Sequence, residues 1–271
     1  MKLLILCISL LTSLMAQTEL IQISRFEHNN AIFYGKVLDN TIQPLENNIF
    51  DKLINKGKPI ALSSVKILLP TQPQNVFAVG MNFASHIASQ STLPPPMFFK
   101  SPSALILSSK DIHLPHDATN VHFEGELVLI IGKKAKNIKQ EDAHKYIFGV
   151  TVGNDLTERN WQGSDLQWMR AKASDGFAPI GTKITIGADY NNLLLTTRLN
   201  DKIVQQENTK YMIHKPSKVV SYLSQYFTLM PGDLIYMGTP GRTQKLSNKD
   251  LVSVTIEDLG AVENRIYSSN K

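Results

Sequence analysis

The 271-residue sequence contains a single cysteine, Cys7. One thiol cannot form a disulfide within the chain, and Cys7 lies in an N-terminal segment that is typical of a cleaved leader. The remainder of the chain therefore has neither a cysteine nucleophile nor a thiolate metal ligand. This absence does not decide the cellular compartment.

Long apolar runs are also missing. The stretch Leu3–Ala16 follows Lys2 and is shorter than the roughly 20 residues that a transmembrane helix needs. A positive residue, an apolar stretch of this length and a small residue before Gln17 are typical of a signal peptide over residues 1–16. We therefore expect an exported, periplasmic protein with no membrane attachment after cleavage. The alternative is a cytoplasmic protein whose apolar start is an ordinary N-terminal strand.

The sequence has no dense block of one charge. Its 28 basic and 23 acidic residues are scattered and give a net charge of +5, which predicts a solvated surface and no nucleic-acid partner. There is no Gly-Lys-Ser/Thr phosphate loop, no dinucleotide fingerprint and no internal repeat. The apolar share of 42% is ordinary for a globular protein and sufficient for a substantial core.

The first part of the chain differs in pattern from the rest. Short alternating runs at Leu20–Phe26, Ala31–Leu38 and Thr41–Leu45 are separated by Asn and Asp turns, which predicts a small β-meander. The segment Leu69–Pro73 contains two prolines and predicts a stiff connector. We expect a small β-rich domain over residues 17–72 and a larger domain over residues 73–271.

The larger region combines strands with helices, which predicts a β-rich α+β fold. Its most apolar stretch, Leu127–Ile131, is apolar on both alternating faces and indicates a strand buried on both sides. The other expected elements are strands at Val76–Gly80, Ile147–Asn154 and Leu234–Met237, a hairpin over Leu193–Gln205 and a helix over Pro216–Met230.

Three carboxylates stand at the ends of the two central strands. Glu124 and Glu126, two positions apart on a strand, project to the same face with Cα atoms about 7 Å apart, and Asp155 follows the second strand. Burying an unpaired carboxylate away from water costs free energy, and a bound cation is the simplest way to offset that cost. Oxygen ligands, with few nearby histidines, favour Mg²⁺ or Mn²⁺ over zinc or copper.

A structural interpretation of the same residues stays open at this point. Glu124 and Glu126 are equally compatible with the exposed start of an edge strand. Asp155 and Glu158 have the spacing of a capping box for a following helix.

Six ordered blocks bear on this choice. They are Gly80-Met81-Asn82-Phe83-x-x-His86, Phe99-Lys100, Glu124-x-Glu126, Asp155-x-Thr157-x-Arg159-Asn160-x-Gln162, Lys172-x-x-Asp175-x-x-x-Pro179-x-Gly181 and Pro231-Gly232-Asp233-x-Ile235-x-x-Gly238-Thr239-Pro240. In the type, order and spacing of these blocks the chain resembles the fumarylacetoacetate hydrolase family, and the resemblance runs from about residue 64 to residue 264.

The resemblance implies a mixed β-roll or barrel catalytic domain over residues 73–271 and a divalent ion, Mg²⁺ or Mn²⁺. It implies that an enolate of a 2-oxo or β-diketo acid is stabilised by this ion, leading to C–C hydrolysis, decarboxylation or isomerisation, in aromatic catabolism for example. A homodimer is also expected. The roles implied are metal ligation by Glu124, Glu126 and Asp155, catalysis by His86 and Lys172, and substrate binding by Arg159, Gln162 and Thr239; for Arg159, pairing with Asp175 is the alternative.

The chain departs from the family at one position. The resemblance implies that a glutamate three residues after His86 helps it to activate water, but residue 89 is serine. Without that carboxylate the imidazole loses an orienting neighbour that raises its basicity. We therefore expect weakened hydrolysis, and the alternative is a catalytically weak protein of this fold that binds a metal and a ligand.

Overall fold

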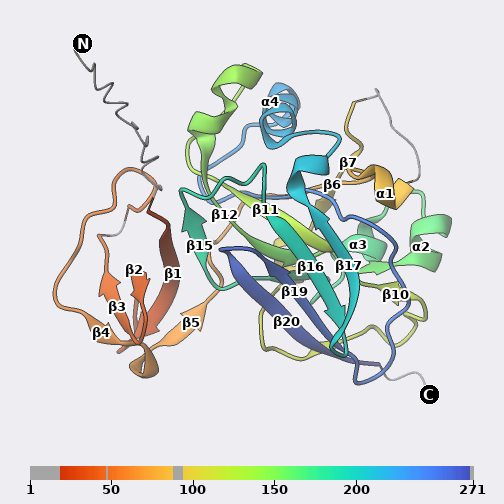
Figure 1. Cartoon of the computed structure of the whole chain (residues 1–271), viewed down its shortest axis with the longest axis horizontal. Coiled ribbons are helices and arrows are strands. Elements are labelled where there is room, and N and C mark those ends of the chain that lie inside the picture. The colour runs from red at the N-terminus through yellow and green to blue at the C-terminus, as the bar shows by residue number, and fades with distance from the viewer. Residues whose placement is uncertain (1–18, 47, 88–93, 269–271) are drawn as a thin grey trace, which may run out of the picture.

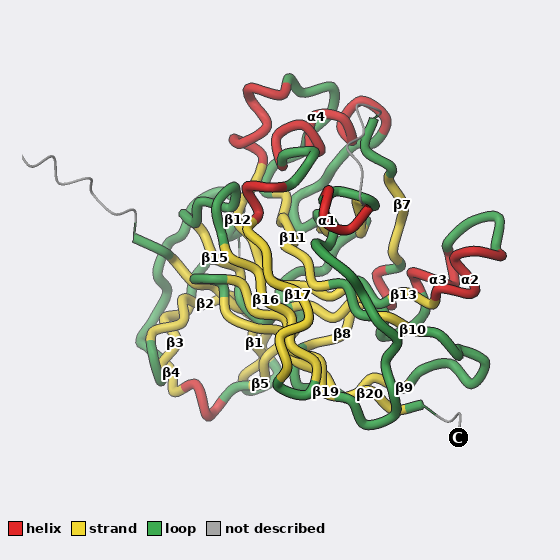
Figure 2. Tube along the Cα trace, turned by 45° about the vertical axis from the view of Figure 1, so that its right-hand side comes forward, coloured by secondary structure: helices red, strands yellow, loops and turns green. Residues whose placement is uncertain are grey.

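The computed structural model describes residues 19–46, 48–87 and 94–268. The expected signal peptide and Ser89 lie outside these residues. Within them, strands form the centre of the molecule and short helices lie at its periphery (Figures 1 and 2). This is the predicted β-rich α+β architecture. No helix in this part of the chain is both long and apolar enough to cross a bilayer.

The N-terminal strands form the antiparallel meander that the alternation predicts, and they lie at one side of the molecule (Figure 1). The two-residue turn between the first two strands is made by Asn29 and Asn30, both with positive φ. The strands are β1 (Ile21–His28), β2 (Ala31–Leu38), β3 (Thr41–Pro44), β4 (Ile60–Ala61) and β5 (Lys66–Leu68).

A single mixed sheet runs from this meander into the rest of the chain. Its strands have the order β4-β3-β2-β1-β15-β12-β11-β18-β6-β7, with β5, β8 and β14 paired beside this path. The join is the antiparallel pair of β1 and β15, in which Ile21 lies opposite Ile186. The added strands are β6 (Val76–Val79), β7 (Met97–Lys100), β8 (Leu105–Leu107), β11 (Gly125–Ile131), β12 (Ile147–Asn154), β14 (Ala178–Ile180), β15 (Ile184–Ile186) and β18 (Leu234–Tyr236).

A second sheet covers the first. It has the order β17-β16-β19-β20-β9, and the expected hairpin turns at Asn200 and Asp201. Its strands are β9 (Ile112–His113), β16 (Leu194–Leu199), β17 (Lys202–Asn208), β19 (Leu251–Ile256) and β20 (Gly260–Tyr267), while β10 (Val121–His122) and β13 (Thr157–Glu158) form a separate pair.

The helices are short. Among the described residues the longest α-helix is α4 (Pro216–Tyr226). It starts at a proline, which has no N–H to leave unpaired in the first turn, and it ends before the predicted Met230. The others are α1 (Ala84–Ile87), α2 (Arg159–Ser164) and α3 (Met169–Ala173), with 3₁₀ turns at Leu62–Ser64, Pro102–Ala104, Gln140–Tyr146 and Thr209–Tyr211.

The strands β11 and β12 form the buried centre. Every residue of β11 is buried, and the two strands pair from Gly125 opposite Asn154 to Ile131 opposite Ile147. Gly125 is required because a Cβ there would lie 2.2 Å from the Thr197 hydroxyl of the second sheet. Strand pairing places the start of β11 beside the end of β12, and the second sheet packs closely over the start of β11.

Candidate metal and active site

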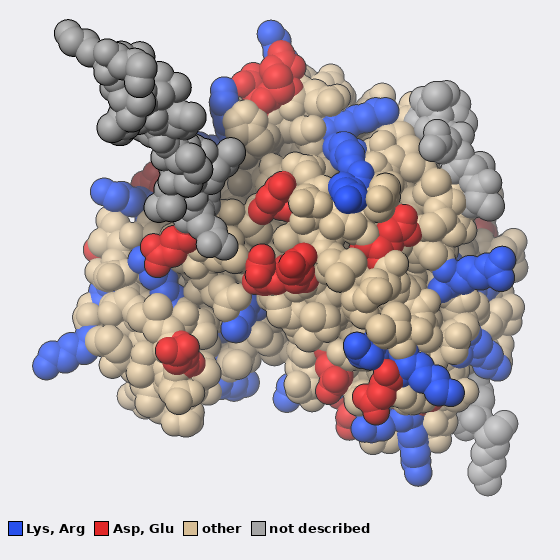
Figure 3. Space-filling view, in the orientation of Figure 1, with Lys and Arg blue, Asp and Glu red and all other residues tan. Residues whose placement is uncertain are grey.

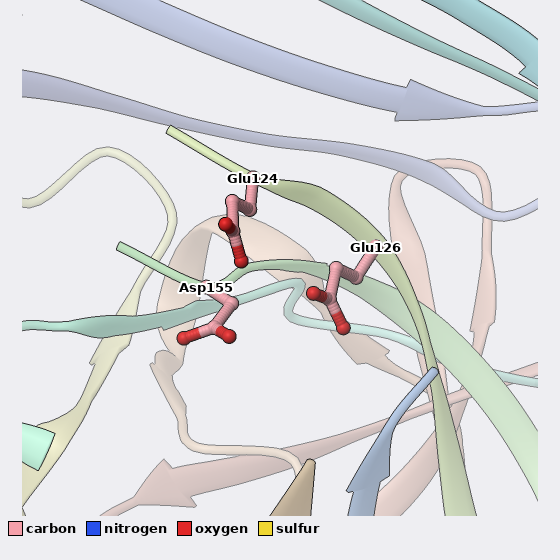
Figure 4. Close-up of side chains that lie close together, drawn as sticks. All are labelled: Glu124, Glu126 and Asp155. Atoms are coloured by element: carbon pink, nitrogen blue, oxygen red, sulfur yellow. The ribbon is translucent and has the colours of Figure 1, made fainter. Parts of the chain in front are cut away.

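Three carboxylates converge at these strand ends. One oxygen from each of Glu124, Glu126 and Asp155 lies within 4.8 Å of the others, and the close-up shows the three side chains pointing toward one another (Figure 4). The residues are between 1% and 5% exposed. Oxygen ligands in this number and spacing fit a hard divalent cation. We call these residues the acidic triad.

Backbone contacts hold the acidic triad in place. The Asp155 N–H donates to the Glu124 carbonyl at 2.8 Å, which locks the end of β12 beside the residue that precedes β11. The Gly238 N–H donates to Glu126 Oε2 at 2.7 Å. Gly238 has φ of 89°, and a Cβ there would lie 2.6 Å from Asn82 Cβ, so only glycine suits this approach.

The capping box is not formed by Asp155. Glu158 caps α2 by accepting from the Trp161 N–H at 2.7 Å, and it also accepts from Asn120 N–H at 2.7 Å. Asp155 instead contacts the two lysines described below, so the edge-strand and capping interpretations are both wrong.

Two buried lysines face the acidic triad. Lys172 Nζ, from α3, donates to Glu124 Oε2 at 2.8 Å and to Asp155 Oδ2 at 2.7 Å. Lys100 Nζ, at the end of β7, donates to Asp155 Oδ1 and to the Lys172 carbonyl. Lys100 therefore supports both a triad carboxylate and the backbone of the second lysine.

Burial and neighbouring charges shift the pKa values of four groups in the site. Burial alone lowers the pKa of Lys172, but the Asp155 and Glu124 carboxylates outweigh it and raise that pKa above its ordinary value. Burial dominates at Lys100 and lowers its pKa despite Asp155. Burial, Asp155 and Glu124 together raise the pKa of Glu126 well above its usual range. Burial also acts to raise the pKa of Glu124, but Lys172 and Arg159 outweigh it and lower that pKa.

His86 reaches the site from α1. Its Nδ1 lies 2.6 Å from the Gly241 carbonyl oxygen. A carbonyl only accepts, so Nδ1 carries the proton and Nε2 is left as the basic nitrogen. Gly241 thus supplies an orienting contact of the kind that the resemblance assigns to a glutamate at position 89.

Arg159 pairs with the acidic triad. Its Nη2 donates to Glu124 Oε1 and, at 2.9 Å, to the Thr243 hydroxyl, while Nη1 donates to Gln162 Oε1 at 2.8 Å. Its salt bridge among the described residues is to Glu124, so the alternative pairing with Asp175 is not formed.

A small cavity of about 50 Å³ lies against these groups. Its lining includes seven of the eight predicted site residues, and the eighth, Asp155, contacts the lining residue Lys172. The lining residues are Val79, Gly80, Met81, His86, Phe98, Glu124, Glu126, Arg159, Gln162, Trp168, Lys172 and Thr239. Lys172 Nζ also lies 4.8 Å from the centre of the Phe98 ring, so one wall is aromatic.

Sequence reasoning gave no role to Lys100, Gln205 or Thr243. Lys100 carries the clearest missed signal, because a lysine that ends an apolar strand is rarely buried without a charged partner. Gln205 and Thr243 carry no local signal, since their partners lie 34 and 84 residues away in the chain.

Comparison with known proteins agrees with this geometry. Residues 75–267 match the profile described as "Fumarylacetoacetate (FAA) hydrolase C-terminal", and residues 22–70 match "Rv2993c-like, N-terminal". The rat protein "Oxaloacetate tautomerase Fahd2a, mitochondrial" is 39% identical over 76% of this chain and 71% of its own.

Solved structures show the same fold. A 5-carboxymethyl-2-hydroxymuconate delta-isomerase from Mycobacterium smegmatis is 31% identical and covers 92% of this chain and 100% of its own, with a TM-score of 0.86. A fumarylpyruvate hydrolase from Pseudomonas aeruginosa, in complex with Mn²⁺ and pyruvate, is 27% identical and covers 75% of this chain and 92% of its own, with a TM-score of 0.70.

The fold and the relatives define an enzyme of a class that includes isomerases and hydrolases, with a buried acidic triad suited to a divalent cation. The chain belongs to the fumarylacetoacetate hydrolase family.

Proposed function

We propose that this enzyme acts on 2-oxo or β-diketo acids through an enolate and depends on Mg²⁺ or Mn²⁺. The observation that carries the proposal is the buried acidic triad beside Lys172, whose pKa is raised, in a cavity that also holds His86. The rat relative named as an oxaloacetate tautomerase and the neighbour solved with Mn²⁺ and pyruvate support it.

In this proposal Glu124, Glu126 and Asp155 hold the ion. When bound, it supplies a Lewis acid that polarises the keto group. The Lys172 ammonium stays charged and stabilises the negative charge that develops on the keto oxygen. Its protonated state is favoured because its two carboxylate partners raise its pKa.

The remaining site residues bind the substrate and move its proton. His86 Nε2 takes a proton from the carbon beside the keto group, because Nδ1 is committed to the Gly241 carbonyl, and the resulting imidazolium returns that proton to the enolate oxygen, which gives the enol. Arg159, Gln162 and Thr239 hold the polar groups of the substrate, and Thr239 meets its carboxylate. A hydrolytic water needs a further base, and position 89 is serine, so keto–enol tautomerisation of an oxaloacetate-like acid is the favoured outcome over C–C hydrolysis.

A substrate panel tests the function. Oxaloacetate enolisation and decarboxylation and acylpyruvate cleavage are measured by ultraviolet absorbance with Mg²⁺, with Mn²⁺ and with EDTA. We expect metal-dependent oxaloacetate turnover that Lys172→Met abolishes, and an unchanged rate in the surface control Lys145→Met. Metal-dependent ligand binding without turnover of any of these acids would favour the catalytically weak alternative.

The cellular context is also part of the proposal. We propose a homodimer, which sedimentation would measure. Within each chain, residues 17–72 and 73–271 form two domains in this proposal, and the matches to residues 22–70 and 75–267 support this division.

We propose export through residues 1–16. Figure 3 shows acidic and basic side chains interspersed on one face of the molecule, which suits a small-molecule substrate better than nucleic acid.

A further inference from the structure

Gln205 is a buried amide next to the active site. It lies on β17, is 3% exposed, and does not line the cavity. Its Oε1 accepts from the Gly125 N–H at 3.2 Å, and its Nε2 donates to the Thr239 hydroxyl at 2.9 Å and to the Pro240 carbonyl. One side chain therefore links the backbone between Glu124 and Glu126 to the loop that follows β18.

The partners of this amide determine its orientation. The Gly125 N–H can only donate and the Pro240 carbonyl can only accept, so the amide oxygen faces Gly125 and the nitrogen faces the loop. Both amide protons are then used, one on Pro240 and one on Thr239. The Thr239 hydroxyl is consequently an acceptor toward Gln205.

This arrangement sets the polarity of Thr239. A hydroxyl that accepts one hydrogen bond still has its own proton to donate. Among the described hydrogen bonds, Thr239 donates to no other group, and its side chain lines the cavity beside the acidic triad. Its proton is therefore available to a ligand.

We infer that Gln205 is a positioning residue that keeps the Thr239 hydroxyl as a hydrogen-bond donor toward a substrate carboxylate. The inference rests on the proposed function, in which Thr239 meets that carboxylate. Gln205 also ties the loop after β18 to Gly125, which lies between two residues of the acidic triad, because it contacts both. A glutamate at this position accepts only, so the Thr239 proton turns toward it and away from the substrate.

The test measures pyruvate affinity by calorimetry on the full chain saturated with Mn²⁺. Each of the variants Gln205→Glu and Thr239→Val removes a hydrogen bond from the Thr239 hydroxyl to the pyruvate carboxylate. Because a hydrogen bond to a charged group contributes substantially to the binding free energy, we expect each variant to weaken pyruvate binding about 10- to 100-fold. Thr239→Ser keeps the hydroxyl and restores affinity. Gln206→Glu is the matched control, because Gln206 is the exposed neighbour on the same strand and contacts Thr196.

A double variant separates polarity from simple charge repulsion. If Gln205→Glu acts through Thr239, it causes no further loss when Thr239 is already valine; an equal loss in that background means repulsion and overturns the inference. Gln205→Met adds no charge, leaves the hydroxyl free to turn to the Pro240 carbonyl, and is expected to show a smaller loss. Wild-type affinity in both Gln205 variants also overturns the inference while leaving the proposed function intact. Wild-type protein that binds Mn²⁺ but no pyruvate overturns both.

Discussion

Replacing Lys100 with methionine tests how the acidic triad is balanced. Three carboxylates face three cations, Lys100, Lys172 and Arg159, and the Lys100 and Asp155 side chains are at most 1% exposed. Methionine has a similar length, so the change removes charge with little loss of packing. Breaking a buried ion pair on one side typically costs about 3–5 kcal/mol. We expect a loss toward the lower end of this range, because Asp155 keeps its second partner, Lys172.

The expected loss is large enough to measure directly. In a chain of this size, about 3–5 kcal/mol corresponds to a melting temperature lower by about 6–20 °C. Urea denaturation in EDTA gives the free energy of unfolding without metal. Adding Mn²⁺ is expected to stabilise Lys100→Met more than the wild type, because the ion offsets the negative charge of Asp155, which in the variant keeps Lys172 and loses Lys100.

The control is an exposed pair of the same chemistry. Lys145 Nζ lies 2.6 Å from Asp142 Oδ1, with side chains 60% and 42% exposed, so Lys145→Met is expected to leave the free energy of unfolding unchanged. Equal, small effects of the two substitutions, in EDTA and in Mn²⁺ alike, would refute the reasoning.

Four further predictions concern the site and the N-terminus. Calorimetry should detect one Mg²⁺ or Mn²⁺ site per chain, which Glu126→Gln loses; equal binding by the variant contradicts the assignment. Burial and neighbouring carboxylates raise the pKa of Glu126, so protonation of this carboxyl competes with metal binding. Metal affinity should therefore rise with pH, and proton release should appear when buffers of different ionisation enthalpy are compared; pH-independent binding speaks against this. With His86 intact, Ser89→Glu should raise the rate of acylpyruvate hydrolysis by up to about 10²–10⁴-fold relative to oxaloacetate turnover, because it restores a general base. Efficient wild-type hydrolysis that the substitution leaves unchanged argues against a missing base. Intact-mass analysis of protein from the native host should find Gln17 at or near the N-terminus; a full-length species refutes cleavage.

The central strands and the acidic triad were predictable because their signal is local. The strand β12 has the predicted bounds, and β11 begins at Gly125, so Glu124 stands just before it. Apolar residues on both faces of these strands require burial, and acidic residues at their ends are unusual enough to be informative. The meander was predictable for the same reason, since alternation and Asn turns are features of neighbouring residues.

The contacts that complete the site were not predictable, since each joins distant segments. Lys100 and Asp155 are 55 residues apart, and Gly241 lies 155 residues after His86. The missing carboxylate at position 89 suggested an imidazole without an orienting partner, whereas a backbone carbonyl, which has no side-chain signature, holds it. Only the packing of β7, α1 and the loop after β18 around the triad brings these groups together.

The pairing of β1 with β15 makes the N-terminal strands part of the same sheet that carries the site. β15 lies between β1 and β12 in the sheet, so a chain without the meander would present β15 as an open edge with unpaired N–H and carbonyl groups. The same loss would uncover Phe148, which packs edge-on against Phe50 with ring centres 4.9 Å apart. An open strand edge beside exposed aromatic surface favours self-association, so the meander protects the catalytic sheet from aggregation without contributing a residue to its chemistry.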